Sequence, residues 1–459
     1  MKISVHSGDV LTKDGAADTS LYSAFRHLHR TPNIQYPIQK MRPHGAIKSL
    51  CIIGVALAFN QQLYSQVVEI IPGPLLETRP ENGTPIAATA ETNSIFSPPR
   101  GMSLSLSVVG GYDDNVNGSS FGGSSSLYTS ETAALSYTFG TPRTLVSLAT
   151  GGGITYYFDH PGGHDHDTNA YLGLSLTHKA SRRMTLSLSV FASYQTQPDL
   201  STNLGSNQQL GSFVHSTDTI SLAYSWMPRF STVTSYTFGL VKYDSSAGSF
   251  QNRMDHTFSE QFRYLLWPAT TGVAEYRYGI IDYESAPLNS TTHFLLAGLE
   301  HSFTPRLNGS FRGGVELRSS ESNGFQPGPY FESTLSYILR RNGSVIWTNQ
   351  YSIEEADVPG ASARPSFRTG LTLNYGFTRR LSGSLALFYV HGGNQSGGGS
   401  SSSGSSSTED TLDIGPSLHY FINRRLSADV GYHYTEVESG SVFSSYSKNN
   451  FFAGLNLNF

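Results

Sequence analysis

The densest group of potential metal ligands in the sequence lies between Asp159 and Asp167. His160, His164 and His166 supply three imidazoles there, and neighbouring carboxylates add oxygen donors. Imidazole and carboxylate at this spacing can bind Zn, Ni or Cu. The ligands sit in a loop that contains glycine, however, and the sequence offers no second set to complete a rigid site. A solvated loop is the preferred interpretation, so we expect neither a metal nor another cofactor.

A second group, Tyr112-Asp-Asp-Asn-Val-Asn117, offers oxygen ligands suited to Ca²⁺. It lacks the glycine and the distal glutamate of a helical calcium loop. Cys51 is the single cysteine, which excludes a disulfide framework and an all-cysteine metal site. The sequence shows no paired carboxylates at a catalytic spacing and no phosphate-binding loop, so it predicts no enzyme.

Charged side chains on alternating segments form a third group. A period of two separates them from the apolar residues of the same segments, so the two sets lie on opposite faces. If the apolar face contacts lipid, the charged face lines a lumen. Both signs are present, which favours weak ion selectivity; alternatively these groups pair across strands and support the wall. The pore-lining candidates are Arg263, Glu275, Arg277, Arg312, Glu316, Arg318, Glu332, Arg368 and Asp429.

The elements that would position these groups repeat about every 40 residues from Met102 onward. Each unit has an alternating strand such as Met184–Tyr194, adjacent aromatic residues, a tight turn with Pro or Arg, and a second alternating strand. That period fits two membrane strands of roughly ten residues with one short and one longer connection. The pattern predicts an all-β, transmembrane, antiparallel up-and-down β-barrel of about eighteen strands, with about sixteen as the alternative. Pro416 and Glu260 fall on apolar faces, which leaves the register of two strands open.

The composition agrees with a barrel and excludes other classes. Charged residues make up 14% of the chain, aromatic residues 12% and hydrophobic residues 38%. The body of the chain lacks the apolar runs of about 20 residues that a helical membrane protein needs. A barrel needs apolar side chains only at alternate positions, and aromatics beside the tight turns match a girdle at the membrane interface. The net charge of -4 argues against a nucleic-acid partner.

The N-terminal region predicts export. Residues 41–65 read as a signal peptide, because a positively charged flank precedes an apolar run of suitable length. Residues 1–40 lack this pattern and are interpreted as an extension upstream of the true start. Residues 66–100 contain prolines at a density that breaks helices and sheet ladders, so we expect an extended periplasmic arm. The barrel would then occupy residues 101–459.

The chain ends in an alternating segment whose last residue is aromatic. Apolar side chains in this segment share one face, as a period of two requires. Bacterial outer-membrane barrels often end in this way, and the ending resembles the signal that their assembly machinery reads. We therefore interpret four residues as an assembly signal: Phe451, Leu455, Leu457 and Phe459.

The run Gly110–Asn117, the arginine-containing turns and the terminal phenylalanine together resemble the β-barrel porin type 2 family of Gram-negative outer-membrane proteins. The likeness covers residues 100–459, and Tyr112, Asp113 and Asn115 are its most specific part. The resemblance implies an outer-membrane barrel and transfers no catalytic residue. It also implies a link to exopolysaccharide secretion for some related barrels.

Three functions are open at this stage. The leading hypothesis is a porin-like channel in the cell outer membrane that passes small hydrophilic solutes, because a barrel of about sixteen to eighteen strands encloses a water-filled lumen. The second is an accessory barrel for exopolysaccharide export. The third is a surface adhesin or structural protein that acts through its outer loops. The expected partners are outer-membrane lipid, the barrel assembly machinery, and solutes or polysaccharide, whereas the oligomeric state is not predicted.

Overall fold

The structure, a computed structural model, describes most of the chain after residue 100. The described residues are 101–120, 122–160, 165–196, 212–244, 249–339, 342–355, 361–393, 395–396, 408–440 and 445–459. The predicted extension (1–40), signal peptide (41–65) and arm (66–100) lie outside them. Within the described part, no helix is long and apolar enough to span a membrane.

Strands account for most of the described residues. They are β1 (Met102–Asp113), β2 (Ser126–Gly140), β3 (Thr144–Tyr157), β4 (His166–Lys179), β5 (Met184–Gln195), β6 (Phe213–Met227), β7 (Phe230–Tyr243), β8 (Arg253–Trp267), β9 (Thr270–Tyr283), β10 (Ser290–Thr304), β11 (Leu307–Ser320), β12 (Gly324–Leu339), β13 (Gly343–Glu354), β14 (Ala361–Gly376), β15 (Leu381–Gly393), β16 (Gln395–Ser396), β17 (Thr408–Phe421), β18 (Leu426–Ser439) and β19 (Tyr446–Asn458). One short 3-10 helix, η2 (Ser249–Gln251), precedes β8.

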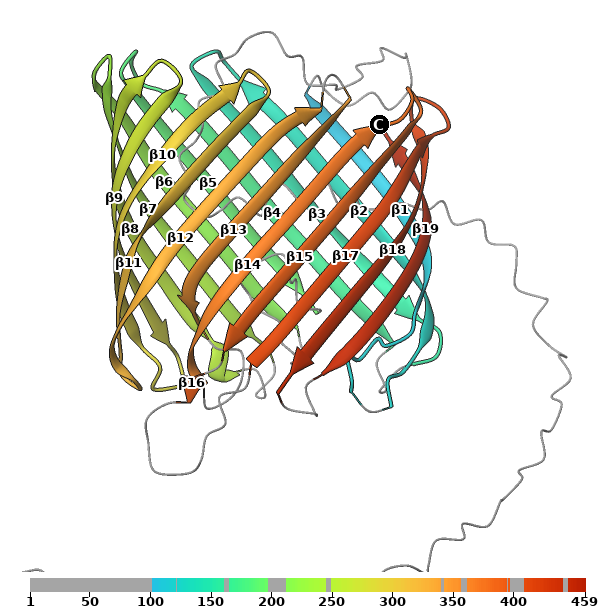
Figure 1. Cartoon of the computed structure of the whole chain (residues 1–459). Coiled ribbons are helices and arrows are strands. Elements are labelled where there is room, and N and C mark those ends of the chain that lie inside the picture. Colours follow the sequence, from blue (N-terminus) through green and yellow to red (C-terminus); the bar gives the residue numbers. More distant parts are fainter. Residues whose placement is uncertain are drawn as a thin grey trace, which may run out of the picture. The chain divides into compact units, whose positions relative to one another are not determined.

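The strands form a closed antiparallel barrel (Figure 1). The two-residue strand β16 pairs with β14, and the other 18 strands make the wall. Each wall strand pairs with its neighbours in sequence, and β1 pairs with β19 to close the ring. The prediction of about eighteen strands is therefore confirmed. Two ends are distinguished below: the tight-turn end, where short turns and Phe459 lie, and the long-loop end opposite it.

The strands are longer than predicted. β13 has 12 residues and β14 has 16, against roughly ten expected from the apolar period. Strands that tilt by about 35–45° and continue past the apolar band need more residues than the band alone requires. The alternation of side chains sets only the part of a strand within the band, so the sequence underestimates the total length.

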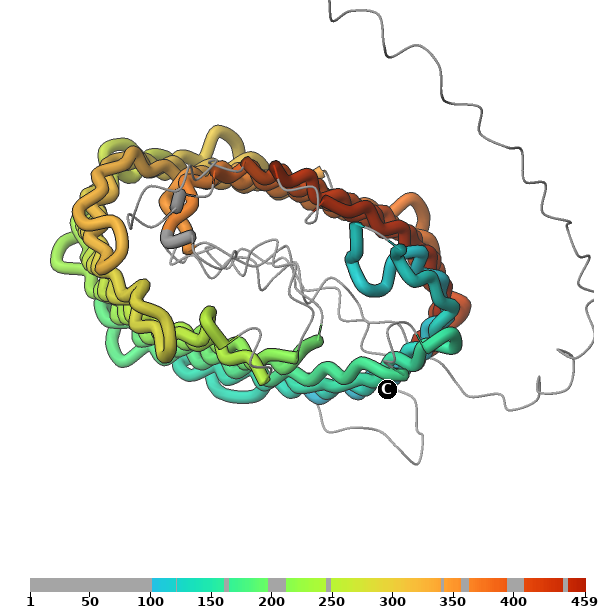
Figure 2. Tube along the Cα trace, turned by 90° about the horizontal axis from the view of Figure 1, so that it is seen from below, coloured from blue at the N-terminus to red at the C-terminus, as the bar shows by residue number. Residues whose placement is uncertain are grey.

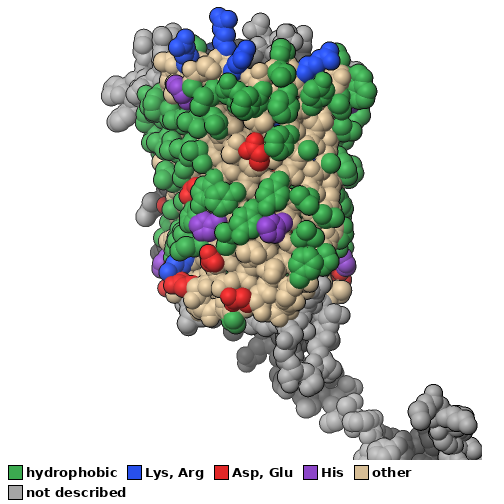
Figure 3. Space-filling view, turned by 90° about the vertical axis from the view of Figure 1, so that its left-hand side faces the viewer, with side chains coloured by type: hydrophobic (Ala, Val, Ile, Leu, Met, Phe, Trp, Pro, Cys, Tyr) green, Lys and Arg blue, Asp and Glu red, His purple; other side chains and the backbone are tan. Residues whose placement is uncertain are grey.

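Exposure is inverted relative to a soluble protein. Along β8, Phe258 and Phe262 are 49% and 48% exposed, whereas Ser259 and Gln261 between them are 4% and 2% exposed. Large apolar side chains on the outside and buried polar ones on the inside are the arrangement expected of a wall surrounded by lipid. Figure 3 shows hydrophobic side chains over much of one outer face.

The registers of the two strands that contain Pro416 and Glu260, which the sequence left open, are regular at these residues. Pro416 lies in β17 opposite Leu385 of β15, and the β17–β18 pairing continues with an unchanged register on both sides of it. Proline lacks an N–H, so a ladder bond is missing there without a shift of the strand. Glu260 of β8 also keeps its outward position, where its carboxylate accepts a hydrogen bond from Thr234 Oγ1 at 2.5 Å.

Aromatic pairs mark the tight-turn end of the wall. Rings two residues apart on one strand pack against each other: Tyr137 and Phe139 are stacked at a centroid distance of 4.9 Å, and Tyr224 and Trp226 meet edge to face at 4.7 Å. Trp226 and Trp267 are among the most exposed side chains of this end. Amphipathic rings at this level are typical of a membrane interface, so the structure agrees with the girdle predicted beside the turns.

The seam between β1 and β19 is closed at both of its ends. At the tight-turn end, Phe459 N–H donates to Leu104 O at 2.9 Å, and Leu104 N–H donates to Phe459 O at 3.3 Å. The terminal strand directs Phe451 and Leu455 outward, as its alternation predicts.

At the long-loop end, the Tyr-Asp-Asp-Asn motif crosses the seam. Asp113 accepts hydrogen bonds from Lys448 Nζ at 2.9 Å and from Asn450 Nδ2 at 3.2 Å. Both carboxylate oxygens of Asp114 accept bonds from Asn449 at 2.7 Å. Asn115 Nδ2 donates across the seam to a backbone carbonyl, Ser447 O, at 2.9 Å. We call these contacts the seam clamp.

Viewed along its axis, the wall has an elongated outline rather than a circular one (Figure 2). The connection between β1 and β2 bends to the inner side of that outline (Figure 2). Its buried residues include Asn115 and Val116, so this connection packs against the wall at the long-loop end.

Candidate functional site: the charged lumen face

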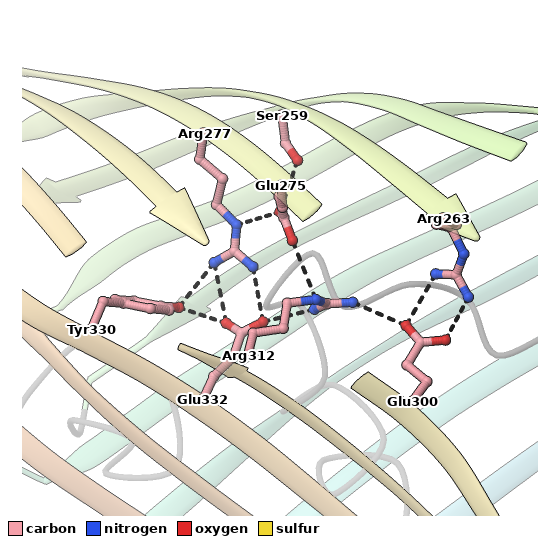
Figure 4. Close-up of polar contacts among 8 residues, drawn as sticks. All are labelled: Ser259, Arg263, Glu275, Arg277, Glu300, Arg312, Tyr330 and Glu332. Atoms are coloured by element: carbon pink, nitrogen blue, oxygen red, sulfur yellow. Dashed lines mark hydrogen bonds and ion pairs between the residues drawn. The ribbon is translucent and has the colours of Figure 1, made fainter. Parts of the chain in front are cut away.

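Charged residues of five neighbouring strands meet on the inner face of the wall. Alternation places Arg263 of β8 inward between the exposed Phe262 and Tyr264, and the same rule turns Glu275 and Arg277 of β9 inward. The residues that complete the group are Glu300 of β10, Arg312 of β11, and Tyr330 and Glu332 of β12. Figure 4 shows their side chains converging; we call this group the lumen cluster.

Arg312 is the centre of the lumen cluster. Its Nη1 donates to Glu332 Oε1 at 2.7 Å, and its Nη2 donates to Glu300 Oε1 at 3.2 Å. Its Nε lies 3.3 Å from Glu275 Oε2. Arg263 holds the far side of Glu300 through two hydrogen bonds, at 3.1 and 2.5 Å. One guanidinium thus joins carboxylates from three different strands, and a second continues the chain.

Arg277 closes the other side of the cluster. Its guanidinium donates to both oxygens of Glu332, at 2.8 and 3.1 Å, and to Glu275 Oε1 at 2.5 Å. It also donates to Tyr330 Oη at 2.9 Å, and its carbon lies 5.6 Å from the centre of that ring. Planar guanidinium groups suit such paired contacts with carboxylates, whereas a lysine at this position would make fewer.

The cluster is electrically balanced. Three guanidinium groups face three carboxylates, and the Arg277 and Glu275 side chains are 5% and 0% exposed. Opposite charges this close cancel most of each other's field at the distance of a passing ion. The geometry therefore matches the alternative stated from the sequence, in which the charges pair across strands.

A second set of ion pairs lies nearer the long-loop end. Arg364 Nη1 of β14 donates to Glu409 Oε1 of β17 at 3.1 Å. Arg368 of β14 is paired with Glu354 of β13, and its Nη2 donates to Glu354 Oε2 at 2.7 Å. On β11, Arg318 lies 2.5 Å from a carboxylate oxygen of Glu355. Pairs of opposite sign thus continue around this part of the wall.

The remaining two candidates have partners of other kinds. Glu316 of β11 accepts a hydrogen bond from the backbone N–H of Ile353 at 2.9 Å. Asp429 of β18 contacts His419 of β17 and the side-chain amide of Asn456 in β19. Asp429 therefore joins three consecutive strands close to the tight-turn end.

All nine sequence candidates lie on the inner face, and each has a polar partner among the described residues. Their role in lining the pore stays a prediction, because pairing supports the wall whether or not solutes pass. The sequence-based set omitted Glu300, Glu354, Arg364 and Glu409, which make the pairs described above. Alternation could have revealed Glu300, because the exposed Leu295 and Leu299 fix the outward parity of β10.

Hydroxyl groups form hydrogen bonds on the inner face of β2, β3, β6 and β7. Thr155 Oγ1 of β3 donates to Ser130 Oγ of β2 at 2.9 Å, and Thr219 of β6 shares a hydrogen bond with Thr237 of β7 at 3.0 Å. The lumen thus has one sector of paired charges and another of neutral hydrogen-bonding groups.

The two groups of possible metal ligands do not form a site in the described part of the chain. No cluster of three or more His, Cys, Asp or Glu residues suited to a metal occurs there. His160 Nδ1 instead lies 2.7 Å from Asp165 Oδ1, and His164 falls outside the described residues. The carboxylates of Asp113 and Asp114 are engaged by the seam clamp.

One family model matches nearly the whole described chain. The family described as "Putative beta-barrel porin 2" aligns with residues 102–459, the range from the first wall strand to the last residue. No curated protein matches the chain.

The solved structures that match the chain include three bacterial proteins, one of which is described as an outer membrane protein. OpdK from Pseudomonas aeruginosa is 11% identical with a TM-score of 0.41, and the match covers 78% of this chain and 99% of that one. OccK5 (OpdH) from the same organism is 14% identical with a TM-score of 0.41, covering 78% and 98%. OccAB4 from Acinetobacter baumannii is 11% identical with a TM-score of 0.37, covering 78% and 98%.

Proposed function

Because the chain belongs to the porin family described as "Putative beta-barrel porin 2", we propose that it forms a water-filled channel in the outer membrane through which small hydrophilic solutes diffuse. The observation that carries this proposal is the closed 18-strand wall with an apolar outer face and a polar inner face. Barrels of about sixteen to eighteen strands are wide enough to leave an aqueous passage. Porins of this kind are channels, and we predict no catalytic activity.

The paired charges support weak ion selectivity. In the lumen cluster, Arg263, Arg277 and Arg312 are each balanced by carboxylates within 3.3 Å. A ring of unbalanced charge would select one sign of ion, whereas balanced pairs leave little net field in the pore. The hydroxyl groups of β2, β3, β6 and β7 add neutral hydrogen-bonding partners for solutes. We therefore expect uncharged and weakly charged solutes of both signs to pass.

Single-channel recording tests the proposal. Purified, refolded full-length protein in a planar bilayer should give stepwise conductance, and a salt gradient should give a reversal potential close to zero. Compact migration on an unheated gel would verify that the same preparation is folded. A folded but electrically silent protein would refute the channel, and a strongly selective one would refute the argument from paired charges.

Nothing in the described residues favours polysaccharide export or adhesion over solute diffusion. The long connections that would carry an adhesive function lie partly outside the described residues, as residues 197–211 and 397–407 show.

A further inference from the structure

Positive charge is distributed unequally between the two ends of the barrel. All tight turns except the one at Pro268 carry Arg or Lys in the sequence, and none of them carries Asp or Glu. The long connections between the wall strands show the reverse: they contain no Lys or Arg and several acidic residues. A random distribution of surface charge would not separate the signs by the type of connection.

The turn cations are exposed and lack acidic partners. Those classed as exposed are Arg143, Lys179, Arg182, Arg183, Arg229, Arg306, Arg379, Arg380 and Arg424. None of these side chains forms an ion pair with a described residue. At the long-loop end the cations are paired instead: Lys242 with Glu284, and Lys448 with Asp113. We call the exposed set the cationic rim.

The cationic rim lies next to the layer of exposed aromatic residues. Trp226 and Met227 immediately precede the turn that carries Arg229, and Phe303 precedes Arg306 in the same way. Figure 3 shows Lys and Arg gathered at the tight-turn end, beyond the hydrophobic surface of the wall. Aromatic rings sit at the boundary between lipid and water, so the cations beyond them reach the level of lipid headgroups.

We propose that the cationic rim binds the phosphate groups of anionic phospholipids in the leaflet that surrounds the tight-turn end. The positive charge of the rim favours an anionic partner, and guanidinium groups form paired hydrogen bonds with phosphate oxygens. A lipid annulus also fits the distribution of the cations around the barrel, whereas a soluble partner would require them in one sector. This proposal needs only insertion in a membrane and does not depend on conductance.

The tryptophans of the chain provide the assay. Trp226, Trp267 and Trp347 are all exposed on the wall, and the first two lie at the rim. Full-length protein is reconstituted in phosphatidylcholine vesicles that contain a fixed fraction of phosphatidylglycerol. Bromine quenchers are placed on the acyl chains of one lipid or of the other. We expect stronger quenching by brominated phosphatidylglycerol, corresponding to about threefold enrichment at low salt that declines as salt screens the charges.

Matched variants separate charge from fold. Replacing all nine residues of the cationic rim by glutamine should abolish the enrichment, whereas replacing its eight arginines by lysine should retain most of it. Migration of the compact form on an unheated gel checks that both variants fold. Lys242→Gln, at the opposite end, should leave the enrichment unchanged.

Three results would overturn the proposal. Equal quenching by the two brominated lipids in the parent protein would show that the rim does not select anionic lipid. Enrichment that survives in the glutamine variant would place the lipid contact elsewhere. Equal quenching together with rim-dependent capture of soluble polyglutamate would assign the rim to an acidic polymer instead.

Discussion

Asp113 provides the sharpest test of how the barrel is held closed. Its side chain is 2% exposed and accepts hydrogen bonds from Lys448, Asn450 and the backbone N–H of Asn115. In Asp113→Ala the ammonium of Lys448 loses this carboxylate while its own side chain is only 17% exposed. Removing one partner of a buried ion pair costs about 3–5 kcal/mol. We expect the free energy of unfolding to fall by about 3 kcal/mol, because Lys448 retains some access to water.

Asp410→Ala is the matched control. Asp410 also lies near the long-loop end and accepts bonds from Tyr389 at 2.6 Å and His391 at 2.7 Å, but it is 38% exposed and joins β15 to β17. An exposed pair of this kind contributes about 0–1 kcal/mol. Urea unfolding in detergent micelles, followed by the loss of the compact gel band, should therefore separate the two variants clearly.

Hydrogen exchange distinguishes a local clamp from general destabilisation. In Asp113→Ala, backbone amides of β1 and β19 should exchange sooner than those of β9 and β10, because the seam opens first. In Asp410→Ala the seam should exchange as in the parent protein. Equal losses of stability in the two variants, or faster exchange spread evenly over the wall in Asp113→Ala, would refute the assignment of Asp113 to the seam.

Three further predictions concern the terminus, the lumen and the outer face. Deleting Phe459 removes both of its backbone bonds to Leu104 and should lower the amount of assembled protein in outer-membrane fractions without blocking export across the inner membrane; normal assembly would contradict this. Glu332→Gln should shift the reversal potential in a salt gradient towards anion preference, and Arg312→Gln towards cation preference, because each unbalances the lumen cluster; shifts of the same sign would be inconsistent with balanced pairing. Glu260→Gln should raise the free energy of unfolding by about 1 kcal/mol, because a charge leaves the lipid-facing surface; a loss of stability in urea would show that the hydrogen bond from Thr234 to the carboxylate outweighs the cost of the charge.

The fold could be predicted from the sequence because its signals are local. In an alternating strand such as Met184–Tyr194, the sequence itself shows which side chains lie on each face, and each Pro- or Arg-containing turn indicates where a strand ends. Up-and-down connectivity then leaves little freedom in topology, since each strand pairs with the next. Strand length was underestimated because alternation marks only the part within the apolar band.

The contacts on the inner face could be predicted only in part. Parity places Glu275 and Arg312 on one face, but whether they meet depends on the registers of the two strand pairs that link β9 to β11 and on side-chain reach. Parity could have placed Glu300 on the same face, but not its contacts with two arginines of the cluster.

The seam clamp lies beyond sequence reasoning altogether. The Asp114 contact with Asn449 spans 335 positions, and nothing local to either residue indicates the other. The motif was visible as a family resemblance and as a set of oxygen ligands. The contacts of this motif with β19 could be identified only from the structure, because the closed wall brings β1 and β19 together.

The pairing of β1 with β19 also dictates an order of events in biogenesis. β1 is the first wall strand to be synthesised, yet one of its edges finds its partner only when the last residues of the chain have been made. Until then the growing sheet carries two unsatisfied edges, which can pair with other chains and aggregate. Contacts of such large sequence separation also form slowly. A chain of this design therefore depends on being kept apart from its own copies throughout the interval between export and closure.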